Sequence, residues 1–382
     1  MKHLTKFIAD RIGLSVFPVR SPEEHLTAAA QWILRAQAAS ADDGVQHSYD
    51  IRAGKWLPSY PETTGYIIPT LYDYAVHFNS PECAAAAWRM AVWEADIQMA
   101  DGGVRAGHMG AEVVAPTVFN TGQVLFGWAR AFVETRDPRI GSALRRGADW
   151  LVAAMDEDGA WRRFSSPFTS AKLNSYNTRS AFGLVRASEA LGEQRYLDAA
   201  RRNVEWTLGR ALPNGWLPDN CLDAHADDRA LTHTIAYSIR GIMEVAAASG
   251  HSSWMDQAFV LARRVAERQR ADGALPAYYG PQWQALVNWS CVTGNSQMAL
   301  NWQRLARITG DRSLLRHAER ANRFNMSIQD LNTPDLKLRG ALKGSHPIDG
   351  GYMTYRYPNW ATKFFMDALM LEILGDKVTN IG

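Results

Sequence analysis

His233 and Tyr237, four positions apart, are the first candidates for acid–base chemistry in this sequence. Residues at this spacing share one face of a helix, so their side chains would point the same way. A histidine titrates near neutral pH and suits the role of general base, while a tyrosine can supply a second proton site. The pair fits removal of the C5 proton of a uronic acid. The competing interpretation of His233 is a capping or hydrogen-bonded core histidine.

Proton removal from C5 also requires that the neighbouring carboxylate be neutralised. We expect Arg179 with Asn177 to do this, assisted by Lys363 or Arg356. Tyr176 is a further acid or base, because a tyrosine close to two cations loses its proton more easily. These residues together predict a uronate C5-epimerase or a polysaccharide lyase.

Glu62 supports a different reaction, the hydrolysis of a glycosidic bond. That reaction uses two carboxylates about 5–10 Å apart. Glu62 opens a predicted buried helix, where a capping or helix-dipole role competes with catalysis. Its partner would come from a loop, as Asp101, Asp158, Asp219, Asp223 or Asp349. The scarcity of such carboxylates favours uronate chemistry over hydrolysis.

Many aromatic and amide side chains fall near the starts of the predicted buried helices. Aromatic rings cover the apolar face of a pyranose, and amides and cations match its hydroxyl and carboxylate edges. Core packing is the competing interpretation for each aromatic. The predicted substrate contacts are Tyr60, Tyr66, Asn120, Gln123, Trp161, Asn177, Trp216, Asn295, Gln297, Tyr355, Tyr357 and Lys363.

Asp223, His225, Asp227 and Asp228 form a cluster that could hold a divalent cation. A solvated loop is the preferred interpretation, because clusters of this kind are common on protein surfaces. The sequence contains no GxGxxG, P-loop or HExxH motif. We therefore expect neither a metal nor a cofactor.

A repeat organises these residues. Asp-Gly or Asn-Gly turns recur every 56–58 residues. Each turn follows a segment with apolar residues every three or four positions, which is typical of an amphipathic helix with one solvent-exposed face. A sixth such segment, 314–329, leads into a longer and less regular loop. The turns lie at 43–44, 101–102, 158–159, 214–215 and 272–273.

A second helical series begins about 21 residues after each turn. Its members carry fewer charges and are apolar around more of their circumference, so they should be buried on nearly all sides. Most open with Thr, Asn or Ser, which cap helix N-termini. They span 62–75, 119–132, 176–189, 231–244, 293–306 and 358–371.

Six buried helices need six amphipathic ones to cover them, and a closed ring removes the need for end caps. The sequence thus predicts an all-α, single (α/α)6 toroid over 25–375, after a leading segment 1–24. An open α-solenoid is the alternative. In the toroid, all inner N-termini share one bowl, where their partial positive charge favours an anionic ligand. We therefore expect an acidic oligo- or polysaccharide as partner.

The segments YPETTGYIIPTL, FNTGQVLFGW, YNTRSAF, LTHTIAYSIRG and PNWATKFFMDAL resemble proteins of bacterial exopolysaccharide gene clusters, the Vps-type polysaccharide biosynthesis proteins. This resemblance covers nearly the whole chain and implies a role in exopolysaccharide assembly. More distantly, the toroid and its tyrosine-rich bowl are similar to glucuronyl C5-epimerases and α/α-toroid polysaccharide lyases. A non-catalytic sugar-binding subunit of a synthesis complex is the non-enzyme alternative.

Composition excludes several other classes. Of 382 residues, 47% are hydrophobic and 21% charged, which excludes a disordered, collagen-like or coiled-coil chain. Lys and Arg number 41 against 39 Asp and Glu, with no basic block, so no nucleic-acid partner is expected. No apolar run reaches the roughly 18 residues of a transmembrane helix.

The remaining expectations concern location. Cys83, Cys221 and Cys291 are scattered and favour a reducing compartment, so we expect a cytoplasmic protein. The basic start, MKHLTKFIADRIGLSVFPVR, predicts a packed or solvated terminal helix. A helix lying on a membrane surface is the alternative for this segment.

Overall fold

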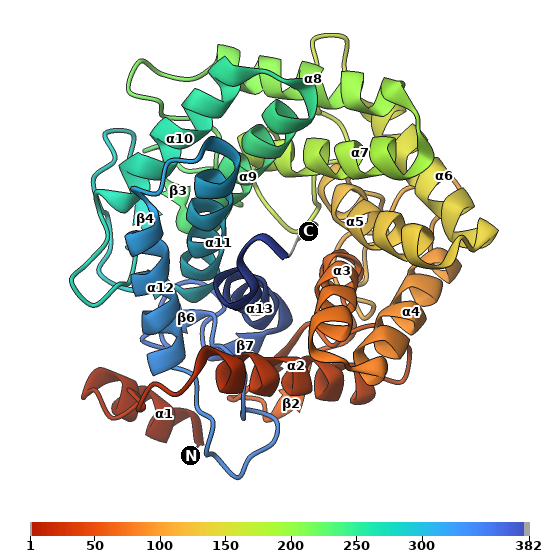
Figure 1. Cartoon of the computed structure of the whole chain (residues 1–382). Helices are drawn as coiled ribbons and strands as arrows, with labels where there is room; N and C mark the ends of the chain where they lie inside the picture. The colour runs from red at the N-terminus through yellow and green to blue at the C-terminus, as the bar shows by residue number, and fades with distance from the viewer. Residues whose placement is uncertain (1, 378–382) are drawn as a thin grey trace.

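Twelve helices form two concentric rings in the computed structural model, which describes residues 2–377 (Figure 1). Each inner helix contacts the next, and α13 returns to α3, so the ring is closed. The inner helices are α3 (Pro61–Phe78), α5 (Val118–Thr135), α7 (Thr178–Leu191), α9 (Thr232–Ser249), α11 (Val292–Thr309) and α13 (Asn359–Leu374). The outer helices are α2 (Pro22–Ala38), α4 (Pro81–Asp96), α6 (Pro138–Ala154), α8 (Gln194–Gly209), α10 (Ser252–Ala266) and α12 (Leu315–Ser327). The predicted (α/α)6 toroid is confirmed.

The helical pairs in space differ from the pairs along the sequence repeat. Each inner helix packs chiefly on the outer helix that follows it, as α3 does on α4, while α13 packs on α2. The Asp-Gly turns and long loops instead connect each outer helix to the next inner one. This offset interlocks successive repeats, because every connection crosses from one spatial pair to its neighbour.

Short strands and one-turn helices brace the loops at the end of the barrel where the inner helices begin. They are β1 (Ser48–Asp50), β2 (Lys55–Trp56), β3 (Ala230–Leu231), β4 (Tyr278–Tyr279), β5 (Ser290–Cys291), β6 (Ser345–His346), β7 (Arg356–Pro358) and η1 (Ser175–Asn177). A second one-turn helix, η2 (Gly375–Lys377), follows α13 at the opposite end of the barrel. All pairings are antiparallel, in the order β2-β1-β7, β3-β4 and β5-β6. The β1–β7 pair joins the first and last loops of the ring, with Tyr49 opposite Tyr357.

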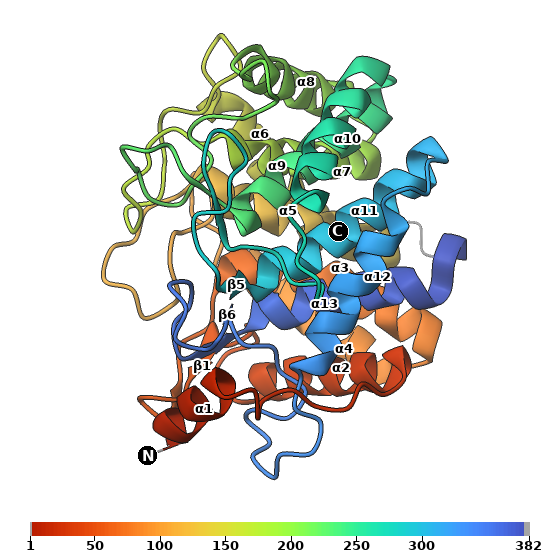
Figure 2. The same cartoon turned by 90° about the vertical axis from the view of Figure 1, so that its left-hand side faces the viewer.

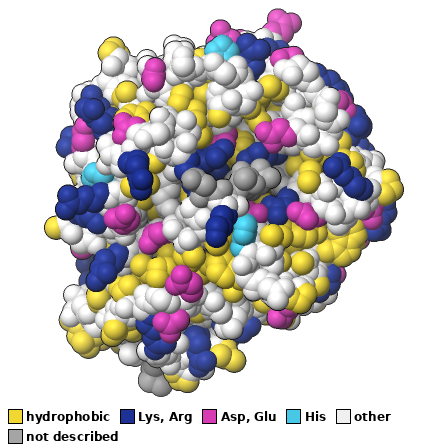
Figure 3. Space-filling model, viewed as in Figure 1, with side chains coloured by type: hydrophobic (Ala, Val, Ile, Leu, Met, Phe, Trp, Pro, Cys, Tyr) yellow, Lys and Arg dark blue, Asp and Glu magenta, His cyan; other side chains and the backbone are white. Residues whose placement is uncertain are grey.

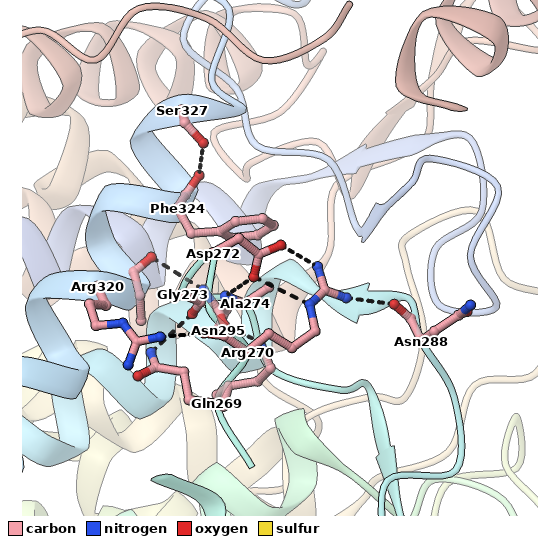
Figure 4. A network of polar contacts seen from close by, with 12 residues as sticks. Gln269, Arg270, Asp272, Gly273, Ala274, Asn288, Asn295, Arg320, Phe324 and Ser327 are labelled. Atoms are coloured by element: carbon pink, nitrogen blue, oxygen red, sulfur yellow. Dashed lines mark hydrogen bonds and ion pairs between the residues drawn. The ribbon is translucent and has the colours of Figure 1, made fainter. Parts of the chain in front are cut away.

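The Asp-Gly turns fix each loop against the next outer helix. In Figure 4, the Asp272 carboxylate accepts a hydrogen bond from the Ala274 N–H at 3.0 Å, and Arg270 pairs with the same carboxylate at 2.6 Å. Gly273 has φ +94°, and a Cβ there would lie 2.2 Å from the Arg320 carbonyl of α12. Only glycine fits this backbone contact.

The sixth turn, which the sequence repeat did not show, is made by Gly340. It has φ +84°, and a Cβ there would lie 2.2 Å from the carbonyl of Ala28 on α2. Gln329 reinforces this closure, since its side-chain N–H groups donate to the carbonyls of Gly340 at 2.7 Å and His25 at 3.2 Å. The side-chain amides of Gln98 and Gln269 make the same pair of hydrogen bonds to backbone carbonyls at two contacts between successive repeats. The last repeat therefore closes onto the first with the chemistry used elsewhere in the ring.

Helix α1 (Lys2–Arg11) lies outside the two rings, beside the loops that precede α13 (Figures 1 and 2). Among residues 2–377, no helix combines the length and hydropathy needed to cross a bilayer.

Candidate active site

A cavity of about 260 Å³ opens at the N-terminal ends of the inner helices. The first turns of α3, α5, α9 and α13 reach it, together with η1 and the loops around them. Its size lies just below the usual range for ligand pockets, about 300–1,000 Å³, and suits one sugar ring. Of the predicted residues, the cavity is lined by Tyr60, Glu62, Tyr66, Asn120, Trp161, Tyr176, Asn177, His233 and Tyr237.

Glu62 is held in this cavity by Tyr60, whose hydroxyl donates to the Glu62 carboxylate at 2.5 Å. Burial raises the pKa of Glu62 to about 7, and the hydrogen bond from Tyr60 offsets only part of that rise. A carboxylic acid with this pKa exchanges a proton readily at neutral pH. Glu62 can therefore serve as a general acid or a general base.

His233 is neutral over the physiological pH range, because burial lowers its pKa to about 4. Its Nδ1 lies 2.8 Å from the side-chain oxygen of Gln297. Since that oxygen only accepts hydrogen bonds, the imidazole proton resides on Nδ1 and Nε2 keeps its lone pair. Gln297 thus does not line the cavity but orients His233 from behind. The arrangement leaves His233 with the nitrogen that a base requires.

The tyrosines of the site are hydrogen-bond donors. Burial, followed by the nearby Glu62 carboxylate, raises the pKa of both Tyr176 and Tyr237 well above the ordinary value. Arg179 lowers the pKa of Tyr237 only in part. The expectation that nearby cations would ease their ionisation was therefore wrong, because desolvation outweighs the effect of the cation.

Arg179, Gln123 and Lys363 lie behind the cavity wall. Arg179 is 1% exposed, its guanidinium packs 4.2 Å from the Phe126 ring, and its Nε donates to Gln123 at 3.3 Å. Lys363 pairs with Asp367 at 2.6 Å, with both side chains fully buried. None of the three lines the cavity; the ring of Tyr237, which does, lies 5.7 Å from the Arg179 guanidinium, and the ring of Phe364 lies 4.3 Å from Lys363 Nζ. The structure thus does not bring these three side chains to the substrate position predicted for them.

Four other predicted substrate contacts have structural roles. The Trp216 N–H donates to Asp228 at 2.8 Å, and Asn295 accepts from the Leu275 backbone at 3.0 Å. Tyr355 lies under the guanidinium of Arg52, 3.9 Å from its ring centre, and Tyr357 is buried within β7. Asn295 repeats a device seen at Thr64, Thr121 and Thr362, which accept from the backbone after their own turns.

The sequence reasoning missed His47, which precedes β1 in an irregular loop. His47 lines the cavity, its ring packs 4.8 Å from that of Trp360, and its Nδ1 lies 2.9 Å from the Ser48 hydroxyl. Burial lowers the pKa of His47 to about 3. No helical periodicity marks this position; its one signal is that it follows an Asp-Gly turn.

Apart from Trp161, the loop between α6 and η1 was also missed, and it supplies a wall of the cavity from Trp161 to Asn174. Arg163 on this loop is the one cationic lysine or arginine lining the cavity within the described chain. The side-chain oxygens of Asn174 and Asn177 are buried and meet no hydrogen-bond donor among residues 2–377. Such acceptors are available to the hydroxyl groups of a ligand.

Asp223 is the loop aspartate that reaches the same cavity as Glu62. Its carboxylate accepts from the backbone and hydroxyl of Ser170 at 3.0 and 3.1 Å. Asp227 pairs with Arg229, and Asp228 accepts from Trp216. Within the described residues, no three His, Cys, Asp or Glu side chains come together as a metal site would require.

No family model and no curated protein matches this sequence. The comparisons thus give no support to the resemblance to exopolysaccharide-cluster proteins.

Solved structures match over nearly the whole chain. An unsaturated glucuronyl hydrolase specific for heparin has a TM-score of 0.75 at 17% identity, covering 94% of this chain and 98% of its own. A D-mannose isomerase has a TM-score of 0.72 at 13% identity, covering 93% and 97%. Cellobiose 2-epimerase from Bacillus thermoamylovorans has a TM-score of 0.69 at 9% identity, covering 87% and 94%. This chain therefore has the α/α-toroid fold of these sugar-converting enzymes.

Proposed function

We propose that this protein is a carbohydrate-active enzyme that removes a proton from C5 of a uronate residue in an oligo- or polysaccharide. The observation that carries the proposal is the presence of a neutral base, His233, and a titratable acid, Glu62, in one aromatic cavity. Structural relatives are named as a glucuronyl hydrolase, a sugar epimerase and a sugar isomerase, which supports a reaction on a sugar.

In the proposed reaction, Nε2 of His233 accepts the C5 proton. Negative charge then develops on the substrate carboxylate, where the Tyr176 and Tyr237 hydroxyls can donate hydrogen bonds. Arg163 replaces Arg179 as the cation for this carboxylate, because it lines the cavity. Protonated Glu62 returns a proton either to C5, which gives the epimer, or to the departing oxygen at C4, which gives elimination.

The test is incubation of the protein with acidic and neutral oligosaccharides in deuterated water. Deuterium at C5 indicates epimerisation, and new ultraviolet absorbance from a double bond indicates elimination. His233→Ala and Glu62→Gln should lower either signal by about 10²–10⁴-fold. His251→Ala is the matched control, because His251 stacks on Trp254 on the outer ring. Full turnover by His233→Ala would refute the assignment.

Hydrolysis is the second candidate, and the placement of Asp223 in the same cavity as Glu62 is the observation that favours it. New reducing ends without deuterium at C5 would identify this reaction. If the enzyme is a hydrolase, Asp223→Asn should abolish turnover. If it instead removes the C5 proton, the same variant should leave proton exchange at C5 largely intact. Binding without any conversion across the panel would instead indicate a sugar-binding subunit.

A further inference from the structure

The N-terminal helix presents an unpartnered apolar face. Leu4 and Ile8 lie one turn apart on α1, and Ile12, Leu14 and Val16 extend the apolar face beyond the end of the helix at Arg11; we call these five residues the docking stripe. Their exposed fractions run from 46% to 70%. The stripe holds a third of the fifteen large hydrophobic side chains that are exposed in the described chain. A concentration of this kind marks an interaction surface.

The barrel holds this helix in place by its opposite face. Asp10, which is 7% exposed, accepts hydrogen bonds from Lys343 Nζ at 2.7 and 2.6 Å and from the Ile348 N–H at 2.7 Å. The Phe17 N–H donates to the Ser327 carbonyl at 2.7 Å. The outward position of the stripe is therefore fixed by buried polar contacts.

The charges around the stripe favour an anionic surface. Asp10 is the one acid between residues 4 and 20, and it is buried. Arg11 is 55% exposed while its partner Asp349 is 18% exposed, and Lys6 is likewise more exposed than its partner Asp330. Arg20, the third cation, pairs with an exposed Glu24. In the two pairs closest to the stripe, the cation is the outer member.

We propose that α1 docks the protein on a phospholipid bilayer containing anionic lipid, with the docking stripe inserted among the lipids. An apolar helix face flanked by cations is the pattern of interfacial helices. A stable protein–protein interface takes about 20–30 residues from each partner, whereas the stripe offers five, on α1 and the segment that follows it. This inference is independent of the reaction proposed above.

Docking through α1 would also orient the active-site cavity relative to the membrane. The segment that anchors Asp10 continues into Tyr352 and Met353, which line the central cavity. Figure 2 shows α1 at the same end of the barrel as the loops around the cavity. Figure 3, which views the opposite end, shows hydrophobic atoms at the lower left, where Figure 1 places α1. A docked molecule would thus hold its cavity on the membrane side.

Sedimentation with vesicles of phosphatidylcholine and phosphatidylglycerol tests the proposal. The full chain should bind these vesicles, bind phosphatidylcholine alone more weakly, and lose affinity as salt is added. The variant Leu4→Ser/Ile8→Ser/Ile12→Ser should bind at least about tenfold more weakly. Val76→Ser/Val133→Ser/Val260→Ser, which changes exposed valines on the barrel, is the matched control and should bind like the wild type.

A second readout locates the contact. Ile12→Cys carrying a polarity-sensitive fluorophore should shift its emission to the blue on vesicles, and Val76→Cys should not; Cys83, Cys221 and Cys291 are buried and remain unlabelled. Absence of wild-type binding, or equal binding by both serine variants, would overturn the proposal. So would a lipid-free dimer that the stripe variant converts to monomer, because the stripe would then be a protein interface.

Discussion

At the scale of single residues, one physical effect prepares both members of the proposed acid–base pair. Burial disfavours charge, so it raises the pKa of Glu62 to about 7 and lowers that of His233 to about 4. Between these values the acid carries its proton and the base lacks one. One cavity with aromatic walls therefore contains a neutral donor and a neutral acceptor, as bifunctional proton transfer requires.

These shifts predict a bell-shaped pH profile. Activity should rise as pH passes about 4, where His233 becomes neutral, and fall as pH passes about 7, where Glu62 loses its proton. The measurement is kcat/KM against pH with the substrate found in the deuterium screen. In Glu62→Gln the residual activity should lose the fall near pH 7. A wild-type profile that stays level through pH 7 would contradict the role of Glu62.

Glu62 should also lower stability at neutral and higher pH. Its folded pKa lies above the unfolded value of 4.5, so folding favours the protonated form and stability falls as pH rises above 4.5. The ionised group then costs about 3 kcal/mol at pH 8. Glu62→Gln should raise the free energy of unfolding at pH 8 and leave it nearly unchanged at pH 4, as measured by urea titration. Glu23→Gln, on an exposed helix start, is the control and should show no such difference.

At the scale of elements, the turns and the side-chain hydrogen bonds that join them to neighbouring helices position the site. Gln37, Gln98, Gln269 and Gln329 each donate to a carbonyl of the turn that follows and to a carbonyl of the next outer helix. Residues at the start of the inner helices accept from the backbone after the same turns. The N-termini of α3, α5, α11 and α13 are therefore each tied to their own loop, which fixes the depth at which their first turns lie in the barrel.

A comparison of Gly192 and Gly273 distinguishes the cost of a positive φ from the cost of a steric clash with a neighbouring helix. Gly192 has φ +71° with nothing near its missing Cβ, whereas Gly273 has φ +94° and meets the backbone of α12. Gly192→Ala should cost about 1 kcal/mol of folding free energy, from the left-handed conformation alone. Gly273→Ala should cost about 3 kcal/mol, because the helix must also move. Equal losses in denaturant titrations would show that the turn does not brace α12.

At the scale of the whole molecule, ring closure joins segments some 300 residues apart. Gln329 bonds Gly340 and His25, α13 packs on α2, and β1 pairs with β7. An open solenoid contacts only its neighbours and can unfold from its ends. A closed ring has no such end, so its helices share one cooperative transition.

Changing Gln329 tests this closure. Gln329→Leu leaves two buried carbonyls and the His25 ring without their partner, which should cost about 1–3 kcal/mol of unfolding free energy. Gln98→Leu makes the same change at an internal joint. In both variants, fluorescence and circular dichroism should still report one coincident transition. Separate transitions in the wild type would indicate an open array.

The sequence by itself determined the ring and the end of it that carries the cavity. The period of the turns and the contrast between amphipathic and fully buried helices follow from local chemistry. Because every repeat has the same polarity, all inner helices begin at the same end of the barrel. Glu62, His233 and Tyr237 were found because they occupy those first turns. The sequence also predicted a helix at the basic start of the chain, but not which face of that helix the barrel would cover.

Only the tertiary structure decided which inward side chains reach the cavity. Arg179 and Lys363 begin inner helices as Tyr66 does, yet neither lines the cavity. Arg179 packs 5.7 Å from the ring of Tyr237 and Lys363 packs 5.1 Å from the ring of Tyr66, and both rings come from other repeats. His47 and Arg163 enter from irregular loops, where no periodicity reports direction. Gly340 replaces an Asp-Gly turn because its contact with α2 exists only in the closed ring. Contacts between distant repeats depend on how the helices close around the axis, and local sequence pattern does not encode that arrangement.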